Sequence, residues 1–508
     1  MMADAARGFD AVVVGGGSAG CVVAERLSRD PSRRVLLVEA GMVPGASEGF
    51  PPDLMDSASV AGIADPRFVW RFPGVLTAQR PYDTVRGRVA GGSSTVNGGY
   101  FIRPTRADLL EWAAIGGSHW SPGRVLPLLR ALEDDRDFAA SAVHGTGGPF
   151  PVHRDGADTP IARTFAAAAA RLGFPPEPDK NAWAEPGIGP VPRNVRDGAR
   201  VNAASAILLP ILDRPNLTVV GDTEVRRVTT AAGRTTGVEI RGPAGGQSIT
   251  APQVVLCAGA IASARLLLVS GVGPAAELDR LGIPVVVDAP RIGAGFGDHP
   301  QLVVQWRPRH AVPAPDGSWL GAALHTEGAE LLATLVSPSA LVGGPDDGTR
   351  TLMTSVMAPR NGGRLAVVAE TGEATLDYGY LATAQDRRRL RELLRLTAEL
   401  LHSKEWRSEA DWTDLPSRFD LNDDDALDAW IRGRIGTSLH TCGTVPFGGD
   451  DAPVDGWGRL RGLEGLVVAD TSILPAAPRR GPAVSALLVG SVIGSALAGI
   501  TTSPDDQD

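Results

Sequence analysis

Short, uninterrupted apolar runs are interleaved with helical segments in the first half of this chain. Residues 11–14 (AVVV) and 35–38 (VLLV) are typical of buried strands, and the segment between them is typical of a helix. The strand-then-helix order returns at 252–271, whereas 216–241 alternates polar and apolar residues as two strands around an Ala-Gly turn. Residues 108–133 carry helical periodicity. This order of elements predicts an α/β fold.

The region 299–436 differs in character. It contains several short strand candidates, LATLVS, TLMTSVMAP and GRLAVVAE. A long helix is predicted over 385–403, with its apolar residues on one face: Leu390, Leu393, Leu394, Leu400 and Leu401. We interpret this region as a separate strand-rich layer. Residues 437–500 then return to a strand, GLVVAD, followed by an uncharged helix.

The uncharged segment 482–500 has two interpretations. Nineteen residues without a charge are enough to span a bilayer, and Gly490-x-x-x-Gly494 is a helix-contact motif of membrane proteins. The segment is rich in Ala, Ser and Gly, however, and therefore only weakly lipophilic. We favour a buried helix of a large α/β core.

A glycine pattern follows the first strand, Gly15-x-Gly17-x-x-Gly20, and an acid, Glu39, ends the second strand. The first glycine allows a tight turn, the second lets the backbone approach a pyrophosphate, and the third lets the helix pack on the strand. An acid about 20 residues further on accepts hydrogen bonds from ribose hydroxyls. The pattern predicts a dinucleotide site and leaves NAD and FAD open.

Length and charge narrow the class of protein. A chain of 508 residues, 43% of them hydrophobic, is too long for one ordinary core, so two or more domains are expected. The net charge of −9 argues against nucleic acid or an anionic membrane as a partner. Three scattered cysteines fit a reducing cytoplasm and no disulfide framework or zinc site. The short polar N-terminus predicts no signal peptide.

A glycine-rich stretch, 86–104 (RGRVAGGSSTVNGGYFIRP), suits a planar ligand. Gly91 and Gly92 allow the backbone to lie flat against a ring, and Asn97 offers a donor and an acceptor at the ring edge. This stretch resembles the first signature of the glucose–methanol–choline (GMC) oxidoreductases, which are flavoenzymes that oxidise alcohols.

Three further stretches resemble the same family in the same order along the chain. They are GAIASARLLLVSGVG (259–273), LGIPVVVDAPRIGAGFGDHP (281–300) and the C-terminal region that starts at LHTCGTVPFG (439–448). The resemblance covers nearly the whole chain and is weakest over 310–420. It implies that the dinucleotide is FAD.

The resemblance implies an α/β fold, α+β overall, with two discontinuous domains. A Rossmann-like FAD-binding domain would be assembled from 8–145, 196–300 and 436–502. An antiparallel, strand-rich cap or substrate domain would be formed by 146–195 and 301–435.

The resemblance also implies which residues hold FAD. Gly15, Gly17 and Glu39 would serve the pyrophosphate and adenosine ribose, Val225 the adenine through its backbone, and Asp470 the pyrophosphate region. The full implied set is Gly15, Gly17, Ser18, Ala19, Gly20, Glu39, Ala40, Val89, Gly92, Ser93, Asn97, Gly98, Gly99, Val225, Asp470, Pro482 and Ala483. The helix after Pro482 would direct its N-terminus at the flavin pyrimidine. Val96 stands where some members tether the flavin through histidine, so non-covalent FAD is predicted.

His440 is the predicted catalytic base. Alcohol oxidation needs the hydroxyl proton removed while hydride leaves carbon, and histidine suits that proton transfer near neutral pH. His440 lies in H-x-x-G-T-x-x-F-G and resembles the family's active-site histidine. His299, in Asp298-His299-Pro300, is interpreted as holding a turn. His144 matches a family turn outside the site.

The chain departs from the family at Gly481. The family places His or Asn before the proline that here is Pro482, and glycine has no side chain to donate or accept. Either the alignment slips, or His440 acts alone, or Arg479 or Arg480 supplies the missing donor. Both arginines could equally face solvent or phosphate at a helix N-terminus.

The sequence therefore predicts a cytoplasmic, FAD-dependent oxidoreductase that acts on an alcohol or a reduced redox cofactor, a dehydrogenase in preference to an oxidase. A narrower hypothesis is the mycofactocin-associated branch, which would re-oxidise a reduced peptide-derived cofactor and feed respiration. The alternatives are an alcohol oxidase using O₂, a cyanohydrin-type lyase with redox-silent FAD, and a non-catalytic flavin-binding protein. The glycine-rich flavin stretch disfavours an NAD dehydrogenase. No metal or transmembrane span is expected, and the electron acceptor and contact with a membrane surface are left open.

Overall fold

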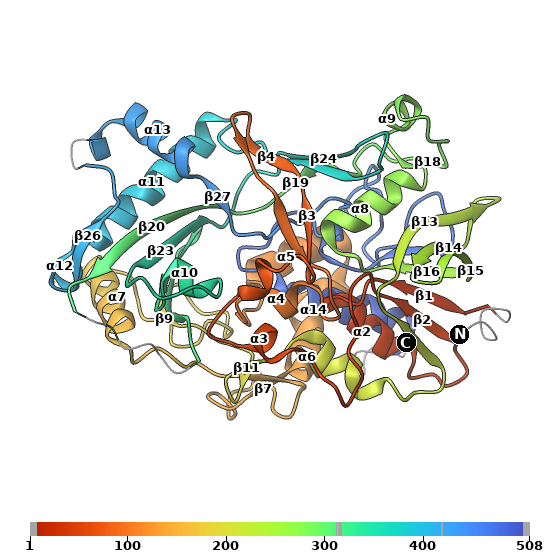
Figure 1. The fold of residues 1–508 in the computed structure, drawn as a ribbon, viewed down its shortest axis with the longest axis horizontal. Helices are drawn as coiled ribbons and strands as arrows, with labels where there is room; N and C mark the ends of the chain where they lie inside the picture. Colours follow the sequence, from red (N-terminus) through yellow and green to blue (C-terminus); the bar gives the residue numbers. More distant parts are fainter. Residues whose placement is uncertain (1–7, 311, 313–316, 418–419, 501–508) are drawn as a thin grey trace.

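The computed structural model describes residues 8–310, 312, 317–417 and 420–500. In Figure 1 the molecule has two sheet-centred regions, with residues near the N-terminus (red) in the region on the right. Much of the strand-rich segment 300–434 (green to blue) forms the region on the left.

Five short parallel strands form the sheet of the first region. Its order is β12 (Leu217–Val220), β2 (Val35–Val38), β1 (Ala11–Val14), β16 (Gln253–Leu256) and β28 (Leu466–Val468). Every residue of β1, β2 and β28 is buried, which explains why these strands are uninterrupted apolar runs. The parallel α/β arrangement predicted from the sequence is confirmed.

Helices α2 (Ser18–Leu27) and α8 (Gly259–Val269) follow β1 and β16, as the strand-then-helix pattern predicted. Helix α14 (Ala483–Leu497) lies beside α2. A Cβ on Gly490 would lie 2.6 Å from the carbonyl oxygen of Ala19, and one on Gly494 would lie 3.2 Å from Cα of Val23. The two glycines therefore allow two helices of the core to approach closely. Among the described residues no helix is long and apolar enough to cross a membrane.

A three-stranded antiparallel sheet, β13 (Glu224–Ala231), β14 (Arg234–Gly242) and β15 (Gly245–Thr250), extends from the first region. The predicted turn joins β13 to β14 through Ala232 and Gly233, both with positive φ (49° and 73°). Two such residues match the twist of a tight hairpin.

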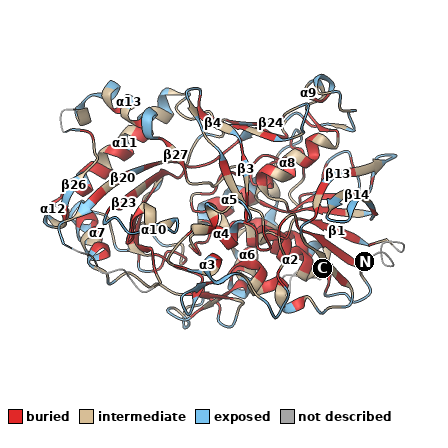
Figure 2. Ribbon diagram, viewed as in Figure 1, coloured by how far each residue is buried: buried red, intermediate tan, exposed pale blue. Residues whose placement is uncertain are grey.

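The second region is built on a seven-stranded, antiparallel sheet. Its order is β26 (Ala410–Thr413), β20 (Pro300–Pro308), β23 (Arg350–Val356), β22 (Ala329–Thr334), β21 (Leu320–His325) and β9 (Ile188–Pro190), with β27 (Gly436–Thr437) beside β20. One face packs on helices α7 (Pro160–Arg171) and α11 (Ala384–Leu401) through a core that includes Leu302, Leu331 and Leu352. The five leucines predicted on one face of α11 are all buried in that core, and the outer side of α11 carries exposed residues in Figure 2.

The periodic segment 108–133 is two helices and not one. Helices α5 (Arg106–Gly116) and α6 (Pro122–Leu132) are separated at Gly117, whose φ of 111° is incompatible with a continuing helix, and Pro122 starts the second helix.

A further five-stranded sheet pairs strands that are distant in sequence. Its order is β19 (Ala294–Phe296), β24 (Gly363–Val367), β25 (Ala374–Asp377), β4 (Gly74–Thr77) and β5 (Arg80–Pro81). Two-stranded pairs are β3 (Val69–Phe72) with β6 (Thr84–Gly87), β7 (Glu133–Asp135) with β8 (Phe150–Val152), β10 (Val195–Arg196) with β11 (Ala199–Arg200), and β17 (Val272–Gly273) with β18 (Val287–Asp288). Further helices are α3 (Pro52–Met55), α4 (Ser93–Val96), α9 (Ala275–Arg280), α10 (Pro338–Leu341), α12 (Lys404–Glu409) and α13 (Asp424–Arg434).

Candidate active site

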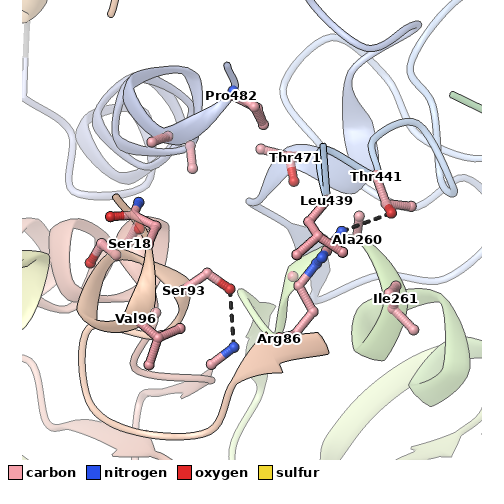
Figure 3. Close-up of a pocket in the computed structure, with 18 of the residues that line it drawn as sticks. Ser18, Arg86, Ser93, Val96, Ala260, Ile261, Leu439, Thr441, Thr471 and Pro482 are labelled. Carbon is pink, nitrogen blue, oxygen red and sulfur yellow. Dashed lines mark hydrogen bonds between the residues drawn. The ribbon is translucent and has the colours of Figure 1, made fainter. Parts of the chain in front are cut away.

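A cavity of about 460 Å³ is lined by residues of both regions. Figure 3 shows Ser18, Ser93 and Val96 on one side of it, and Arg86, Leu439 and Thr441 on another. The lining includes loops at the carboxyl ends of β1, β2 and β16, where α/β sheets bind ligands. It also includes residues of β20, β22 and β23, so the second sheet forms part of the wall.

The glycine fingerprint forms one wall of the cavity. Gly15, Gly17, Ser18 and Ala19 line it, and α2 starts there with Ser18, so its unpaired N-terminal N–H groups lie at the cavity wall. A Cβ on Gly92 would lie 2.8 Å from Cα of Gly17, so two glycine-rich loops meet with no room for a side chain. This closeness fits a pyrophosphate bound against bare backbone.

Glu39 lies at the cavity wall with acceptor atoms that could hold a ribose. Its carboxylate is 6% exposed, lines the cavity, and accepts hydrogen bonds from the N–H groups of Gly16 (2.8 Å) and Gly41 (2.9 Å). Burial raises the pKa of this carboxyl, whereas the backbone N–H groups lower it. Each carboxylate oxygen can accept more than one hydrogen bond, so Glu39 keeps acceptor capacity for ribose hydroxyls. Ala40 and Val225 line the same cavity.

The second glycine-rich stretch lies against the other sheet. The indole N–H of Trp319 donates to the carbonyl of Gly98 (3.1 Å), and a Cβ on Gly98 would lie 2.2 Å from the indole ring. Gly92, Ser93, Val96, Asn97 and Gly98 all line the cavity. The Oδ1 atom of Asn97 accepts from the N–H of Gly99 (3.0 Å). Because this oxygen keeps a second lone pair, Asn97 can still offer an acceptor as well as its amide donor to a ligand.

Asp470 and the start of α14 complete the cofactor side. Asp470 is 3% exposed and accepts from the Ser263 hydroxyl (2.6 Å) and the N–H groups of Gly259 (2.8 Å) and Ser472 (2.9 Å). It thereby ties the start of α8 to the segment after β28. Pro482 and Ala483 line the cavity at the first turn of α14, a 15-residue helix whose N-terminus favours negative charge.

Three of the predicted cofactor residues lie off the cavity wall: Gly20, Val89 and Gly99. A Cβ on Gly20 would lie 1.9 Å from the carbonyl oxygen of Gly15, so this glycine serves helix packing, as the fingerprint predicts for its third glycine. Val89 is fully buried and forms a bridge to Met42. Gly99 has a φ of 68° and turns the chain after Asn97.

His440 lies at the cavity and pairs with His299. Their Nδ1 atoms are 2.8 Å apart and their rings meet edge to face. Only one of these atoms can donate, and when His440 donates, its Nε2 carries the free lone pair. Burial, then the nearby His299 and Arg86, hold the pKa of His440 well below its usual range, so its ring is neutral at pH 7. Burial likewise lowers the pKa of His299 to about 4. His299 was expected only to hold a turn, and it is instead the direct partner of His440.

Asp298 holds the segments that carry both histidines. Its Oδ1 accepts from the N–H groups of His299 (2.7 Å) and His440 (2.9 Å) and from the Thr437 hydroxyl (2.8 Å). Its Oδ2 accepts from the Thr441 hydroxyl (2.7 Å), which also accepts from Arg86 (2.7 Å; Figure 3). Asp298 therefore acts as the turn-holding residue of the Asp-His-Pro motif.

Gly481 faces His440. A Cβ built on Gly481 would lie 3.5 Å from both Cε1 and Nε2 of His440, so the fold does bring this position to His440. Neither neighbouring arginine lines the cavity. Arg479 pairs with Asp108 (2.8 Å) and Glu111, and Arg480 is buried against Glu177 (3.3 Å).

His144 belongs to a buried ionic cluster that does not line the cavity. It contacts Glu133 (2.8 Å), Asp135 (3.0 Å) and Asp179 (2.7 Å). Although burial opposes it, the carboxylates raise the pKa of His144 to about 10. Arg103 and Arg154 share these carboxylates, so the cluster is an ion-pair network.

Sequence reasoning missed the residues that the second sheet contributes: Gln301, Trp319, Leu320, Glu330, Leu332 and Met353, along with Tyr100 beside them. One signal was present. Glu330 interrupts an otherwise apolar strand, and a charge in a buried strand is costly unless it has a use. The strand alternation did not reveal which face meets the cofactor loops.

Comparisons with known proteins identify relatives over nearly the whole chain. The family model for GMC oxidoreductase matches residues 9–301 in its N-terminal part and 359–490 in its C-terminal part. An uncharacterized GMC-type oxidoreductase of Rhodococcus erythropolis is 37% identical over 500 residues, covering 96% of this chain and 98% of that protein. Pyridoxine 4-oxidase of Microbacterium luteolum is 32% identical, covering 92% and 95%. The crystal structure of pyridoxine 4-oxidase from Mesorbium loti aligns with a TM-score of 0.89 at 31% identity, covering 96% and 99%.

Proposed function

Because the chain belongs to the GMC oxidoreductase family, we propose that it oxidises an alcohol carbon by hydride transfer to FAD, with His440 as the base. The family binds FAD and acts on alcohol groups. The observation that carries the proposal is the position of His440, paired with His299, at a cavity whose other walls fit FAD.

When bound, FAD supplies the hydride acceptor. His440 takes the hydroxyl proton at Nε2, and His299 orients the ring by accepting a hydrogen bond from Nδ1–H of His440. Asp298 fixes the backbone of both histidines, which limits their movement during the proton transfer. The low pKa of His440 keeps the lone pair available at neutral pH.

We propose that His440 works without a side-chain partner at position 481. The small residue leaves space directly beside Nε2, where the substrate hydroxyl can lie. Arg479 and Arg480 are engaged with carboxylates, which supports this one-histidine mechanism over an arginine donor.

The test is anaerobic mixing of the yellow enzyme with a panel of alcohols while flavin absorbance is followed. Replacing His440 with alanine should slow bleaching by about 10²–10⁴-fold at unchanged FAD content. The exposed His310 offers a matched control, His310→Ala, which should bleach at the wild-type rate. Bleaching by any alcohol excludes a redox-silent lyase. Equal rates in His440→Ala and wild type would overturn the assignment of the base.

We further propose that the enzyme is a dehydrogenase of the cytoplasm. The three described cysteines, Cys21, Cys257 and Cys442, are free and buried, which supports a reducing compartment. Reoxidation of the reduced enzyme by O₂ and by a quinone analogue is the deciding comparison, and fast reoxidation by O₂ would make it an oxidase. The mycofactocin-associated role stays a prediction, which bleaching by reduced mycofactocin in the absence of reactive alcohols would support.

We also propose the two-domain division of the chain given above. The second core, which gathers Phe165, Leu302, Leu352 and Leu394, supports a cap domain with its own interior. Strands β8, β24 and β25 are exceptions, because Phe150, Leu365 and Leu376 pack in the core of the FAD region.

A further inference from the structure

Four polar residues form a row across the cavity-facing side of the second sheet. Gln301 on β20 lies opposite Ser355 on β23, Ser355 lies opposite Glu330 on β22, and Glu330 lies opposite His325 on β21. The next residues along these strands, Leu302, Leu331 and Leu324, point to the other face and pack in the helix-covered core. The polar row is therefore a feature of the cavity side alone.

The row reaches the segment that carries the catalytic base. The hydroxyl of Ser355 lies 2.9 Å from the hydroxyl of Ser438, and the amide nitrogen of Gln301 lies 3.2 Å from both hydroxyls. Ser438 is two residues from His440, and both residues line the cavity with Gln301 and Glu330.

Glu330 is the charged member of the row, and it is 3% exposed. Its carboxylate lies 2.9 Å from Nε2 of His325 and also forms a hydrogen bond with the hydroxyl of Tyr100, which lies 3.4 Å from the same nitrogen. Arg480 and Lys180 are nearby cations, but each pairs directly with Glu177. Among the described residues no arginine or lysine nitrogen lies within 4.0 Å of the Glu330 carboxylate. His325 and Tyr100 use only part of the acceptor capacity of the two carboxylate oxygens, so this buried carboxylate without a paired cation can accept a further hydrogen bond from a ligand.

We propose that Glu330 is a substrate-binding residue that accepts a hydrogen bond from a second O–H or N–H group of the alcohol substrate. This inference rests on the proposed function and narrows its substrate class to alcohols with two donor groups. The reacting hydroxyl lies at His440, and the second donor reaches Glu330 on the sheet wall. Burial raises the pKa of Glu330 to about 7, and the cations Arg480 and Lys180 oppose this rise, so the ionised acceptor forms at neutral to alkaline pH.

The test compares ligands that differ only in the donor. The 3- and 4-hydroxybenzyl alcohols are compared with the 3- and 4-methoxybenzyl alcohols. The methoxy oxygen on the ring can accept a hydrogen bond but cannot donate one. Dissociation constants are taken from the concentration dependence of anaerobic flavin reduction. The non-oxidisable pairs 3- and 4-methylphenol and their methyl ethers are titrated through changes in flavin absorbance.

In the wild type, at least one phenol should bind about tenfold or more tightly than its methyl ether, as expected for a hydrogen bond to a charged group. The preference should fall to about threefold in Glu330→Gln, a neutral acceptor of the same shape, and disappear in Glu330→Met. Glu239→Gln is the matched control. It removes the same charge from β14, in the three-stranded sheet of the other region, and should leave the preference unchanged.

A wild-type preference near one for both isomers, or an unchanged preference in Glu330→Met, would overturn the proposal. If Glu330→Met does not retain FAD, the binding preference is compared between the wild type and Glu330→Gln, and an equal preference in the two overturns the proposal. Phenol binding that depends on Glu330 without bleaching by any alcohol would refute the proposed function but not this site. Bleaching by alcohols without a donor preference would refute only this site.

Discussion

The contact between His299 and His440 allows a quantitative test of the catalytic arrangement. Replacing His299 with leucine removes the acceptor that lies 2.8 Å from Nδ1 of His440. It fills the fully buried site with an apolar side chain. The His440 ring is then free to carry its proton on Nε2, where it cannot act as a base. His299→Gln is the matched control, because an amide oxygen can still accept that proton.

The magnitude follows from one buried hydrogen bond. Such a bond contributes about 1 kcal/mol net, and 1.4 kcal/mol corresponds to a tenfold change in rate. We therefore expect flavin reduction at saturating alcohol to be about five- to tenfold slower in His299→Leu. Because His299 is not among the cavity-lining residues, substrate dissociation constants and FAD content should change little.

The assay is anaerobic stopped-flow spectroscopy, which separates the limiting rate of flavin reduction from the substrate dissociation constant. His299→Gln should recover part of the lost rate. A His299→Leu enzyme that retains FAD and is reduced at the wild-type rate would show that the reasoning about the proton between the two rings is wrong.

Three further predictions concern pH, packing and the cofactor. Burial, His299 and Arg86 hold the pKa of His440 well below its usual range. The rate of flavin reduction should therefore stay level above neutral pH and fall only on acidification, when the ring takes up a proton. A midpoint at or above about 6.5 in a pH–rate profile would contradict this expectation. Gly490→Ala places a Cβ 2.6 Å from the Ala19 carbonyl oxygen and should lower the free energy of unfolding by about 1–3 kcal/mol, seen as a lower thermal midpoint. Gly433→Ala is the control, because the space around its Cβ is open, and its midpoint should not fall. Equal midpoints in the two variants would refute the close-packing argument. Acid precipitation should release all flavin into the supernatant, because Val96 offers no nucleophile for a covalent link, and flavin retained on the pellet would refute non-covalent binding.

Features encoded in consecutive residues could be predicted well. The first two strands, the helix between them and the close approach of Gly20 to Gly15 follow from local backbone conformation and from runs of apolar residues. The uncharged helix was also interpreted as a core helix, because it is rich in Ala, Ser and Gly and therefore only weakly lipophilic. The helical periodicity over 108–133 corresponds to two helices, and periodicity alone did not reveal the break at Gly117.

The catalytic side depended on contacts between distant residues. His299 and His440 are 141 positions apart, and only the paired loops bring their Nδ1 atoms together. The sequence also did not show that the oxygen of the Asn97 amide accepts a hydrogen bond from the adjacent turn.

By itself, the sequence determined the dinucleotide fingerprint, the parallel strands and the family resemblance, because each depends on residues close together along the chain. The tertiary structure decided what surrounds the reacting atoms. It set Gly481 against His440, turned Arg479 and Arg480 toward carboxylates, and aligned Gln301, Ser355 and Glu330 in one row. The physical reason is strand register: a shift of one residue would turn that row toward the other face of the sheet, and no local pattern specifies which strands become neighbours.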